Sequence, residues 1–128
     1  LIKDGLKAIK WFTDHGIRTN CTLVFSAGQS ILCAKAGAKY VSPFIGRIDD
    51  SGWDGVQLVE QIVKIYNVQG FTTQVLPASI RNPNHIIRCA EAGAHVCTSP
   101  LDSILGLLKH PLTDIGLAKF LEDAKKTA

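Results

Sequence analysis

Hydrophobic and polar residues follow two different periods along this chain, in blocks that alternate from one end to the other. Apolar residues three or four positions apart predict amphipathic helices, and short blocks rich in β-branched residues predict strands. The predicted helices are 4–15, 27–36, 56–67, one from Asn82-Pro83 up to Gly93, 101–109 and 114–126. The predicted strands are 17–25, 38–45, 72–79 and 94–99, and residues 46–55 are predicted to form a polar loop that contains glycine.

The predicted order is a helix, then a strand and a helix four times, then one extra helix. This alternation predicts the α/β class with a parallel sheet. A faint internal repeat supports it, because CAKAGAKYVSP (33–43) matches CAEAGAHVCTSP (89–100) apart from one inserted residue. Two strand–helix units separate the copies, as in a barrel that is built from repeated units.

An eightfold (β/α)8 TIM barrel needs ~250 residues, and this chain has 128. We therefore expect the chain to be the C-terminal half of such a barrel, with four strands, their helices and an extra terminal helix at 111–128. Residues 1–128 would then be the C-terminal portion of a single domain, which fits a chain that begins at Leu1 without Met or a leading strand. A flavodoxin-like open sheet is the alternative.

Composition narrows the class of protein further. Hydrophobic residues make up 46% and charged residues 20%, which indicates a globular domain. The net charge is only +3, and basic and acidic residues are mixed along the chain. This pattern argues against a nucleic-acid partner and suits small anionic ligands. No apolar run approaches the ~20 residues that cross a membrane.

The cysteines and histidines give no sign of a metal centre. The four cysteines have no C-x-x-C spacing and lie in apolar contexts: Cys21, Cys33, Cys89 and Cys97. This pattern predicts free, buried thiols in a reducing cytoplasm rather than disulfides or zinc. The four histidines are dispersed too, so we expect no metal ligand set.

Polar side chains follow the predicted strands at the end where parallel strand–helix proteins bind ligands. The second and third strands deliver hydroxyls and arginines there: Ser42, Arg47, Ser79 and Arg81. Arginine presents a planar fork that matches phosphate oxygens, and the helix after Arg81 adds amide donors. The chain therefore predicts a site for a phosphorylated substrate, although Arg47 could instead form a surface ion pair with Asp49 or Asp50.

A reactive group is missing from the same rim. No Lys, His or Glu follows the carboxyl end of a predicted strand, since Lys39 begins a strand and Lys3 and Lys35 lie on helices. The chain thus offers a binding rim without an evident nucleophile.

Four segments of the chain resemble one family of enzymes. TNCTLVFSAGQ (19–29), AGAKYVSPFIGRIDD (36–50), LPASIRN (76–82) and HPLTDIGL (110–117) are similar to the transaldolase family. The likeness is strongest to its small members, which include the fructose-6-phosphate aldolases, and it runs along nearly all 128 residues.

The resemblance implies a class I aldolase on a βα barrel, without cofactor or metal. A lysine at a strand end forms a Schiff base with the ketose, so that the C3–C4 bond can break. By the family's K-I-P pattern this lysine should lie just upstream of Leu1, and the family's acidic proton-transfer residues lie further upstream. Lys3 comes after the motif and does not match the nucleophile.

The resemblance also assigns roles to residues of this chain. Asn20 matches the amide that binds the donor's hydroxyls, and Thr22 matches the residue that holds the catalytic water. Ser42 and Phe44 should line the pocket beside the Schiff base. The phosphate cradle should consist of Arg47, Ser79 and Arg81.

Phe44 indicates the subtype. The aldolase-only members tend to carry Tyr at this position, and its hydroxyl can protonate the donor carbanion, whereas Phe offers no proton. We therefore expect a transaldolase. The resemblance implies that it acts in the pentose phosphate pathway on fructose 6-phosphate or sedoheptulose 7-phosphate, and the cysteines predict a cytoplasmic location. The alternatives are a fructose-6-phosphate aldolase and a catalytically inactive fragment.

The last helix carries an apolar stripe of its own, made by Ile115, Leu117, Ala118 and Leu121. Small members of the family are decamers in which the terminal helix reaches a neighbour, so the resemblance implies a homo-oligomer. Packing of this stripe on its own barrel is the alternative.

Overall fold

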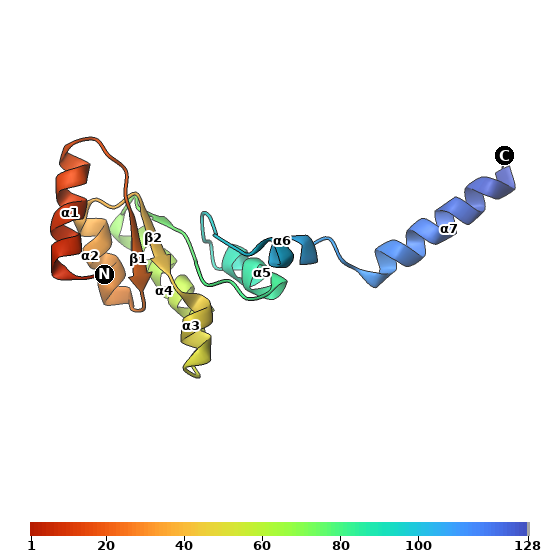
Figure 1. Cartoon of the computed structure of the whole chain (residues 1–128), viewed down its shortest axis with the longest axis horizontal. Helices are drawn as coiled ribbons and strands as arrows, with labels where there is room; N and C mark the ends of the chain where they lie inside the picture. Colours follow the sequence, from red (N-terminus) through yellow and green to blue (C-terminus); the bar gives the residue numbers. More distant parts are fainter. Residues whose placement is uncertain (128) are drawn as a thin grey trace.

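The computed structural model describes residues 1–127 and shows a parallel sheet flanked by helices, with one helix extending away (Figure 1). The helices are α1 (Lys3–Asp14), α2 (Ala27–Ala36), α3 (Ile45–Asp50), α4 (Gly55–Gln69), α5 (Pro83–Glu91), α6 (Leu101–Gly106) and α7 (Pro111–Thr127). The strands are β1 (Asn20–Val24), β2 (Tyr40–Pro43) and β3 (Gln74–Val75). The α/β class and the parallel sheet are confirmed.

The three strands lie in the order β1-β2-β3, with both neighbouring pairs parallel. Asn20 is opposite Tyr40, and Tyr40 is opposite Gln74, so all three strands begin at one edge. Consecutive right-handed crossovers in this order place their helices on the same face of the sheet. The carboxyl ends of the strands therefore open at one common rim, which is where the predicted site residues follow.

Local sequence explains where the crossover helices begin and end. Ser26 caps α2 by accepting a hydrogen bond from the Gln29 amide at 3.2 Å. Asp54 caps α4 in the same way through the Val56 amide at 3.1 Å. Gly37 and Gly70 end these helices in the left-handed region, at φ 97° and 68°, where glycine carries no Cβ penalty.

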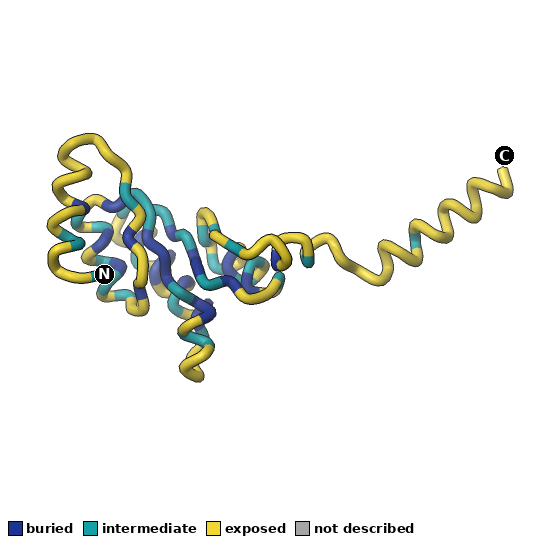
Figure 2. The backbone as a smooth tube through the Cα atoms, viewed as in Figure 1, coloured by how far each residue is buried: buried dark blue, intermediate teal, exposed yellow. Residues whose placement is uncertain are grey.

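The core lies between the sheet and the helices that cover it (Figure 2). Val41 and Val75 contribute from the strands, and Val59 and Ile62 from α4; all four are fully buried. Tyr66 of α4 is also buried, and its hydroxyl donates a 2.7 Å hydrogen bond to the Ser30 carbonyl of α2. Burial raises the pKa of this phenol, so it remains a neutral donor that ties the two helices together.

All four cysteines are free, and three of them are buried. The Cys33 thiol of α2 donates to the Cys21 sulfur of β1, with 2.8 Å between the sulfurs. This hydrogen bond lowers the pKa of Cys21 to about 7 and raises the pKa of Cys33. Burial raises the pKa of Cys89 to about 12.

The predicted polar loop over 46–55 is wrong in its first half. Residues Ile45–Asp50 form α3, and only a short turn separates it from α4 at Gly55. Ile45 is fully buried and anchors the helix, while the Ile48 amide bonds back to the Phe44 carbonyl at 3.2 Å. A buried apolar anchor at the start of this segment thus overrides its polar composition.

The predicted strand over 94–99 does not form, and the sheet of the described residues has three strands. The segment still runs along β3, because the His95 and Thr98 amides donate to the Val75 and Pro77 carbonyls at 3.0 and 3.1 Å. The return bonds fail for two reasons. The Val75 amide donates to His95 Nδ1 instead of a backbone carbonyl, and Pro77 has no amide hydrogen.

Helix α7 leaves the body of the molecule and has no buried residue (Figures 1 and 2). Ile115, Leu117 and Leu121 of the predicted stripe are 63%, 57% and 57% exposed. Residue 128, at the end of the predicted helix 111–128, lies outside the described residues. Within residues 1–127, no helix has the length and apolarity needed to cross a bilayer.

One close approach fixes α3 against the exit of β3. A Cβ added to Gly46 would collide with the Ser79 carbonyl oxygen and would lie 2.6 Å from Arg81 Nε. We expect Gly46→Ala to lower the free energy of unfolding by about 1–3 kcal/mol, because the nearest atom is a backbone oxygen that cannot rotate away. Urea unfolding of the full-length protein measures this change.

Gly28→Ala in α2 is the matched control, because a Cβ there meets nothing closer than Ser26 Oγ at 3.9 Å. This variant should unfold at the same urea concentration as the wild type or at a slightly higher one. Equal losses of stability in both variants would show that the approach at Gly46 carries no special constraint.

Candidate functional site

Three predicted site residues lie together on the sheet face that the crossover helices leave open. Asn20 and Thr22 alternate with the buried Cys21 along β1, so their side chains point to the opposite face. The Ser42 hydroxyl of β2 donates to Asn20 Oδ1 at 3.0 Å, and Ser42 itself is buried. This bond orients the Asn20 amide, and Asn20 Nδ2 donates to no group among residues 1–127, so both amide hydrogens are available as donors.

Two strained positions flank this group. Leu23 and Ser79 are the only non-glycine residues with positive φ among residues 1–127, at 56° and 59°. Leu23 lies in the irregular pairing between Cys21 and Val24, which bends the end of β1. Ser79 lies just beyond β3. Such conformations cost of order 1–3 kcal/mol each and persist only where surrounding contacts enforce them.

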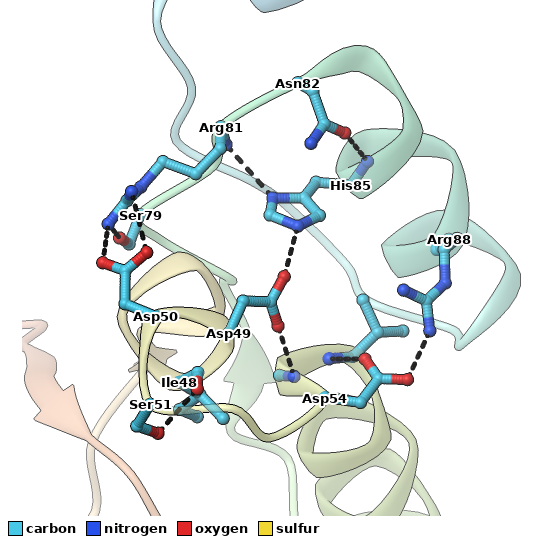
Figure 3. A network of polar contacts seen from close by, with 12 residues as sticks. Ile48, Asp49, Asp50, Ser51, Asp54, Ser79, Arg81, Asn82, His85 and Arg88 are labelled. Carbon is cyan, nitrogen blue, oxygen red and sulfur yellow. Dashed lines mark hydrogen bonds and ion pairs between the residues drawn. The ribbon is translucent and has the colours of Figure 1, made fainter.

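Arg81 and Ser79 lie next to one another at the exit of β3, as Figure 3 shows. Arg81 Nη1 and Nη2 donate to the two carboxylate oxygens of Asp50 at 3.2 and 2.7 Å. Arg81 Nη2 also lies 3.5 Å from the Ser79 hydroxyl. The arginine thus presents its planar fork to a pair of acidic oxygens, which is the geometry that also binds phosphate.

Arg47 does not form the surface ion pair that was the alternative to phosphate binding. Its guanidinium lies over the Phe44 ring at 5.1 Å, and it forms an ion pair with neither Asp49 nor Asp50. Phe44 in turn contacts Phe25 at the exit of β1, with ring centroids 5.8 Å apart. Arg47, Phe25 and Ser26 are among the residues lining an open hollow of about 940 Å³ between α2 and α4.

His85 was not predicted as a site residue, and it is buried in the first turn of α5. Its Nδ1 accepts the Arg81 amide hydrogen at 3.1 Å, so the proton of the neutral ring must be on Nε2. Nε2 then donates to Asp49 Oδ2 at 2.7 Å (Figure 3). Its position three residues after the cap Asn82 was readable in the sequence, but its partner Asp49 lies 36 residues away.

A second ion pair connects α5 to the start of α4. Arg88 Nη2 donates to Asp54 Oδ2 at 2.7 Å, which links α5 to the first turn of α4. This hydrogen bond holds the pKa of the Asp54 carboxyl below its usual value. Asp54 therefore stays ionised while it caps α4.

The structure thus gathers the predicted residues into three groups. Asn20, Thr22 and Ser42 share the open sheet face, while Ser79 and Arg81 lie at the exit of β3 beside Asp50. Phe44 and Arg47 lie where β2 ends and α3 begins. Among residues 1–127, no three His, Cys, Asp or Glu side chains are placed to hold a metal ion.

Comparison with curated proteins shows extensive similarity. A protein of Phocaeicola vulgatus named probable transaldolase is 67% identical over 125 residues, which cover 98% of this chain and 57% of that protein. A probable transaldolase of Cytophaga hutchinsonii is 65% identical over 126 residues, which cover 98% and 58%. The chain therefore spans a little over half the length of these relatives.

Comparison with solved structures supports the fold alone. A mandelate oxidase bound to benzoyl-formic acid superposes with a TM-score of 0.56 at 14% identity, over 73% of this chain and 28% of that one. The family comparison is decisive, because the family described as Transaldolase/Fructose-6-phosphate aldolase matches residues 1–128, the whole chain. The chain belongs to the transaldolase/fructose-6-phosphate aldolase family.

Proposed function

We propose that this chain is part of a transaldolase of the pentose phosphate pathway. The enzyme would move a dihydroxyacetone unit from fructose 6-phosphate or sedoheptulose 7-phosphate to an aldose phosphate. Family membership and the names of the curated relatives support the reaction. The observation that carries the substrate class is the Arg81 fork beside Ser79, because a phosphate offers the same paired oxygens as the carboxylate now held there.

We also propose that the chain is the C-terminal half of a (β/α)8 barrel. Parallel sheets are normally covered on both faces, and here the crossover helices cover one. The open face carries Asn20 and Thr22, the side chains expected inside such a barrel. The chain's 57% coverage of its relatives agrees with a longer protein that supplies further strands.

The reaction needs a Schiff-base lysine, which we place just upstream of Leu1 in the full-length protein. The Leu1 nitrogen lies 3.3 Å from the Thr22 carbonyl oxygen, so residues that precede Leu1 would start beside β1. The lysine amine condenses with the ketose carbonyl and releases water. The C4 hydroxyl then loses its proton, and the iminium takes up the C3–C4 bonding electrons as the aldose leaves. The resulting enamine attacks the acceptor aldehyde, whose oxygen gains a proton, and water hydrolyses the new iminium to release the ketose and the lysine.

The described residues would orient this chemistry. The amide hydrogens of Asn20, whose oxygen is held by Ser42, would bind hydroxyls of the donor. The exposed hydroxyl of Thr22 on the same face would hold the water that relays protons. At the rim, Arg47, Ser79 and Arg81 would form the phosphate cradle, with the substrate phosphate taking the place of Asp50 in the Arg81 fork.

Several further features complete the proposal. Neither metal nor cofactor enters the mechanism, because the iminium is itself the electron sink. The free thiols suit a reducing cytoplasm.

The exposed apolar residues of α7 support a homo-oligomer, with a decamer as the form that the family resemblance suggests.

Fructose-6-phosphate aldolase is the second candidate, because the family description includes it. It would release dihydroxyacetone and glyceraldehyde 3-phosphate without an acceptor. The catalytically inactive fragment is a third possibility for the 128-residue chain by itself, since the nucleophile would lie outside it. Phe44 favours transfer over cleavage, because its side chain has no acidic hydrogen that could protonate the carbanion.

The full-length protein should convert fructose 6-phosphate and a four-carbon aldose phosphate into sedoheptulose 7-phosphate faster than it cleaves fructose 6-phosphate alone. We expect Phe44→Tyr to raise the ratio of cleavage to transfer roughly tenfold, because the new hydroxyl can protonate the carbanion. Phe12→Tyr on α1 is the matched control and should leave the ratio unchanged. An unchanged ratio in Phe44→Tyr would count against the role of Phe44.

We expect Arg81→Ala to reduce kcat/KM for fructose 6-phosphate by roughly 10- to 100-fold, as a lost charge-assisted contact would. The value for unphosphorylated fructose should change little. Arg18→Ala, an exposed arginine at the opposite end of the sheet, is the control and should affect neither substrate. Equal losses on both substrates would remove Arg81 from the cradle.

A further inference from the structure

The exit of β3 is held by a polar network that joins three helices (Figure 3). Its centre is His85, whose side chain is 7% exposed and whose two ring nitrogens are both used. Nδ1 accepts the main-chain hydrogen of Arg81, and Nε2 donates to Asp49. A buried ring with both nitrogens satisfied has one orientation and one tautomer, so it can hold the Arg81 backbone at a fixed point.

Asp49 fixes this ring from the other side. Its Oδ2 accepts from His85 Nε2 at 2.7 Å, while its Oδ1 accepts the Gly55 amide hydrogen at 2.8 Å. One carboxylate therefore joins the end of α3, the start of α4 and the first turn of α5. Within residues 1–127, the His85 ring forms one hydrogen bond to the main chain, which is the bond that it accepts from the Arg81 amide.

The next residue along α3 acts on the same arginine by a different route. Asp50 receives the Arg81 guanidinium in a two-point contact, and Asp49 reaches the Arg81 main chain through His85. Consecutive carboxylates thus hold the side chain and the backbone of one residue. When a phosphate replaces Asp50 in the fork, the hydrogen bond from the Arg81 amide to His85 still holds the Arg81 backbone in place.

The backbone next to Arg81 needs such a restraint. Ser79 has φ 59°, a conformation that an L-residue rarely adopts without support. Gly46 packs closely against the Ser79 carbonyl oxygen, and the hydrogen bond to His85 holds the Arg81 amide two residues later. Together they set the direction of the Ser79 hydroxyl and the Arg81 fork.

We infer that His85, oriented by Asp49, is a positioning residue that fixes the Ser79–Arg81 turn for recognition of the substrate phosphate. This role rests on the proposed function, in which Ser79 and Arg81 bind that phosphate. A purely structural histidine would change stability and affect all substrates alike. A positioning histidine affects phosphorylated substrates selectively.

The test compares three variants of the full-length protein. His85→Leu removes both bonds. In His85→Asn the side-chain oxygen occupies the place of Nδ1 and can accept from Arg81, whereas in His85→Gln the longer amide can donate to Asp49 but reaches past the Arg81 amide. His95→Leu is the matched control, because His95 Nδ1 accepts the Val75 amide hydrogen at 3.0 Å, away from the cradle.

We expect His85→Leu to raise KM for fructose 6-phosphate about five- to tenfold and to leave KM for fructose within about twofold. His85→Asn should restore most of the loss, and His95→Leu should show no selective effect. Equal changes for both substrates, or a better rescue by Gln than by Asn, would overturn the inference.

A second measurement does not depend on catalysis. Nitrogen-15 spectra of the wild type should show an unprotonated Nδ1 and a protonated Nε2 on His85, and a protonated Nδ1 would overturn the inference. If the wild type transfers no dihydroxyacetone unit, the proposed function fails, and titration with inorganic phosphate decides the inference alone. Weaker phosphate binding in His85→Leu than in His95→Leu supports it, and equal binding overturns it.

Discussion

Burial of one face of a three-stranded parallel sheet is the constraint from which the rest of the structure follows. Val41 and Val75 are fully buried beneath the crossover helices, and α4 contributes Val59 and Ile62 to the same layer. Cys21 of β1 is buried in this layer as well. Because side chains alternate along a strand, the residues on either side of Cys21 face the other way. Asn20 and Thr22 are therefore displayed on the open face as a direct consequence of core packing.

The same constraint brings the strand exits together. Parallel strands with common ends leave their loops at one rim, and here helix α3 fills part of that rim. Gly46 lets α3 approach the Ser79 carbonyl, and this approach brings Asp49 and Asp50 to His85 and Arg81. The polar network is thus a product of close backbone packing, and its members come from segments that are more than 30 residues apart.

Local patterns in the sequence predicted the elements that local chemistry determines. Helix α2 was predicted over its observed range, since its serine cap and terminal glycine are both adjacent in sequence. Helix α3 was missed, because its stability comes from burying Ile45 against the sheet rather than from a repeated apolar pattern. The segment 94–99 was predicted as a strand, but His95 accepts a bond that a backbone carbonyl would take in a regular ladder.

The site residues divide in the same way. The residues expected at strand ends could be identified from the chain alone, because parallel topology places them there. Their partners could not be identified from the sequence. Asp50 forms its ion pair with Arg81 rather than with the nearby Arg47, and His85 binds Asp49, which lies 36 residues away. These pairings depend on the close approach at Gly46, which only the three-dimensional structure reveals.

In the proposed mechanism, this chain is part of a Schiff-base enzyme whose lysine precedes Leu1. The most direct measurement is mass spectrometry of peptides from the full-length protein after borohydride reduction in the presence of fructose 6-phosphate. We expect a reduced dihydroxyacetone adduct on a lysine just upstream of Leu1 and none on Lys3. An adduct on Lys3, or no adduct under conditions in which the enzyme turns over, would contradict it.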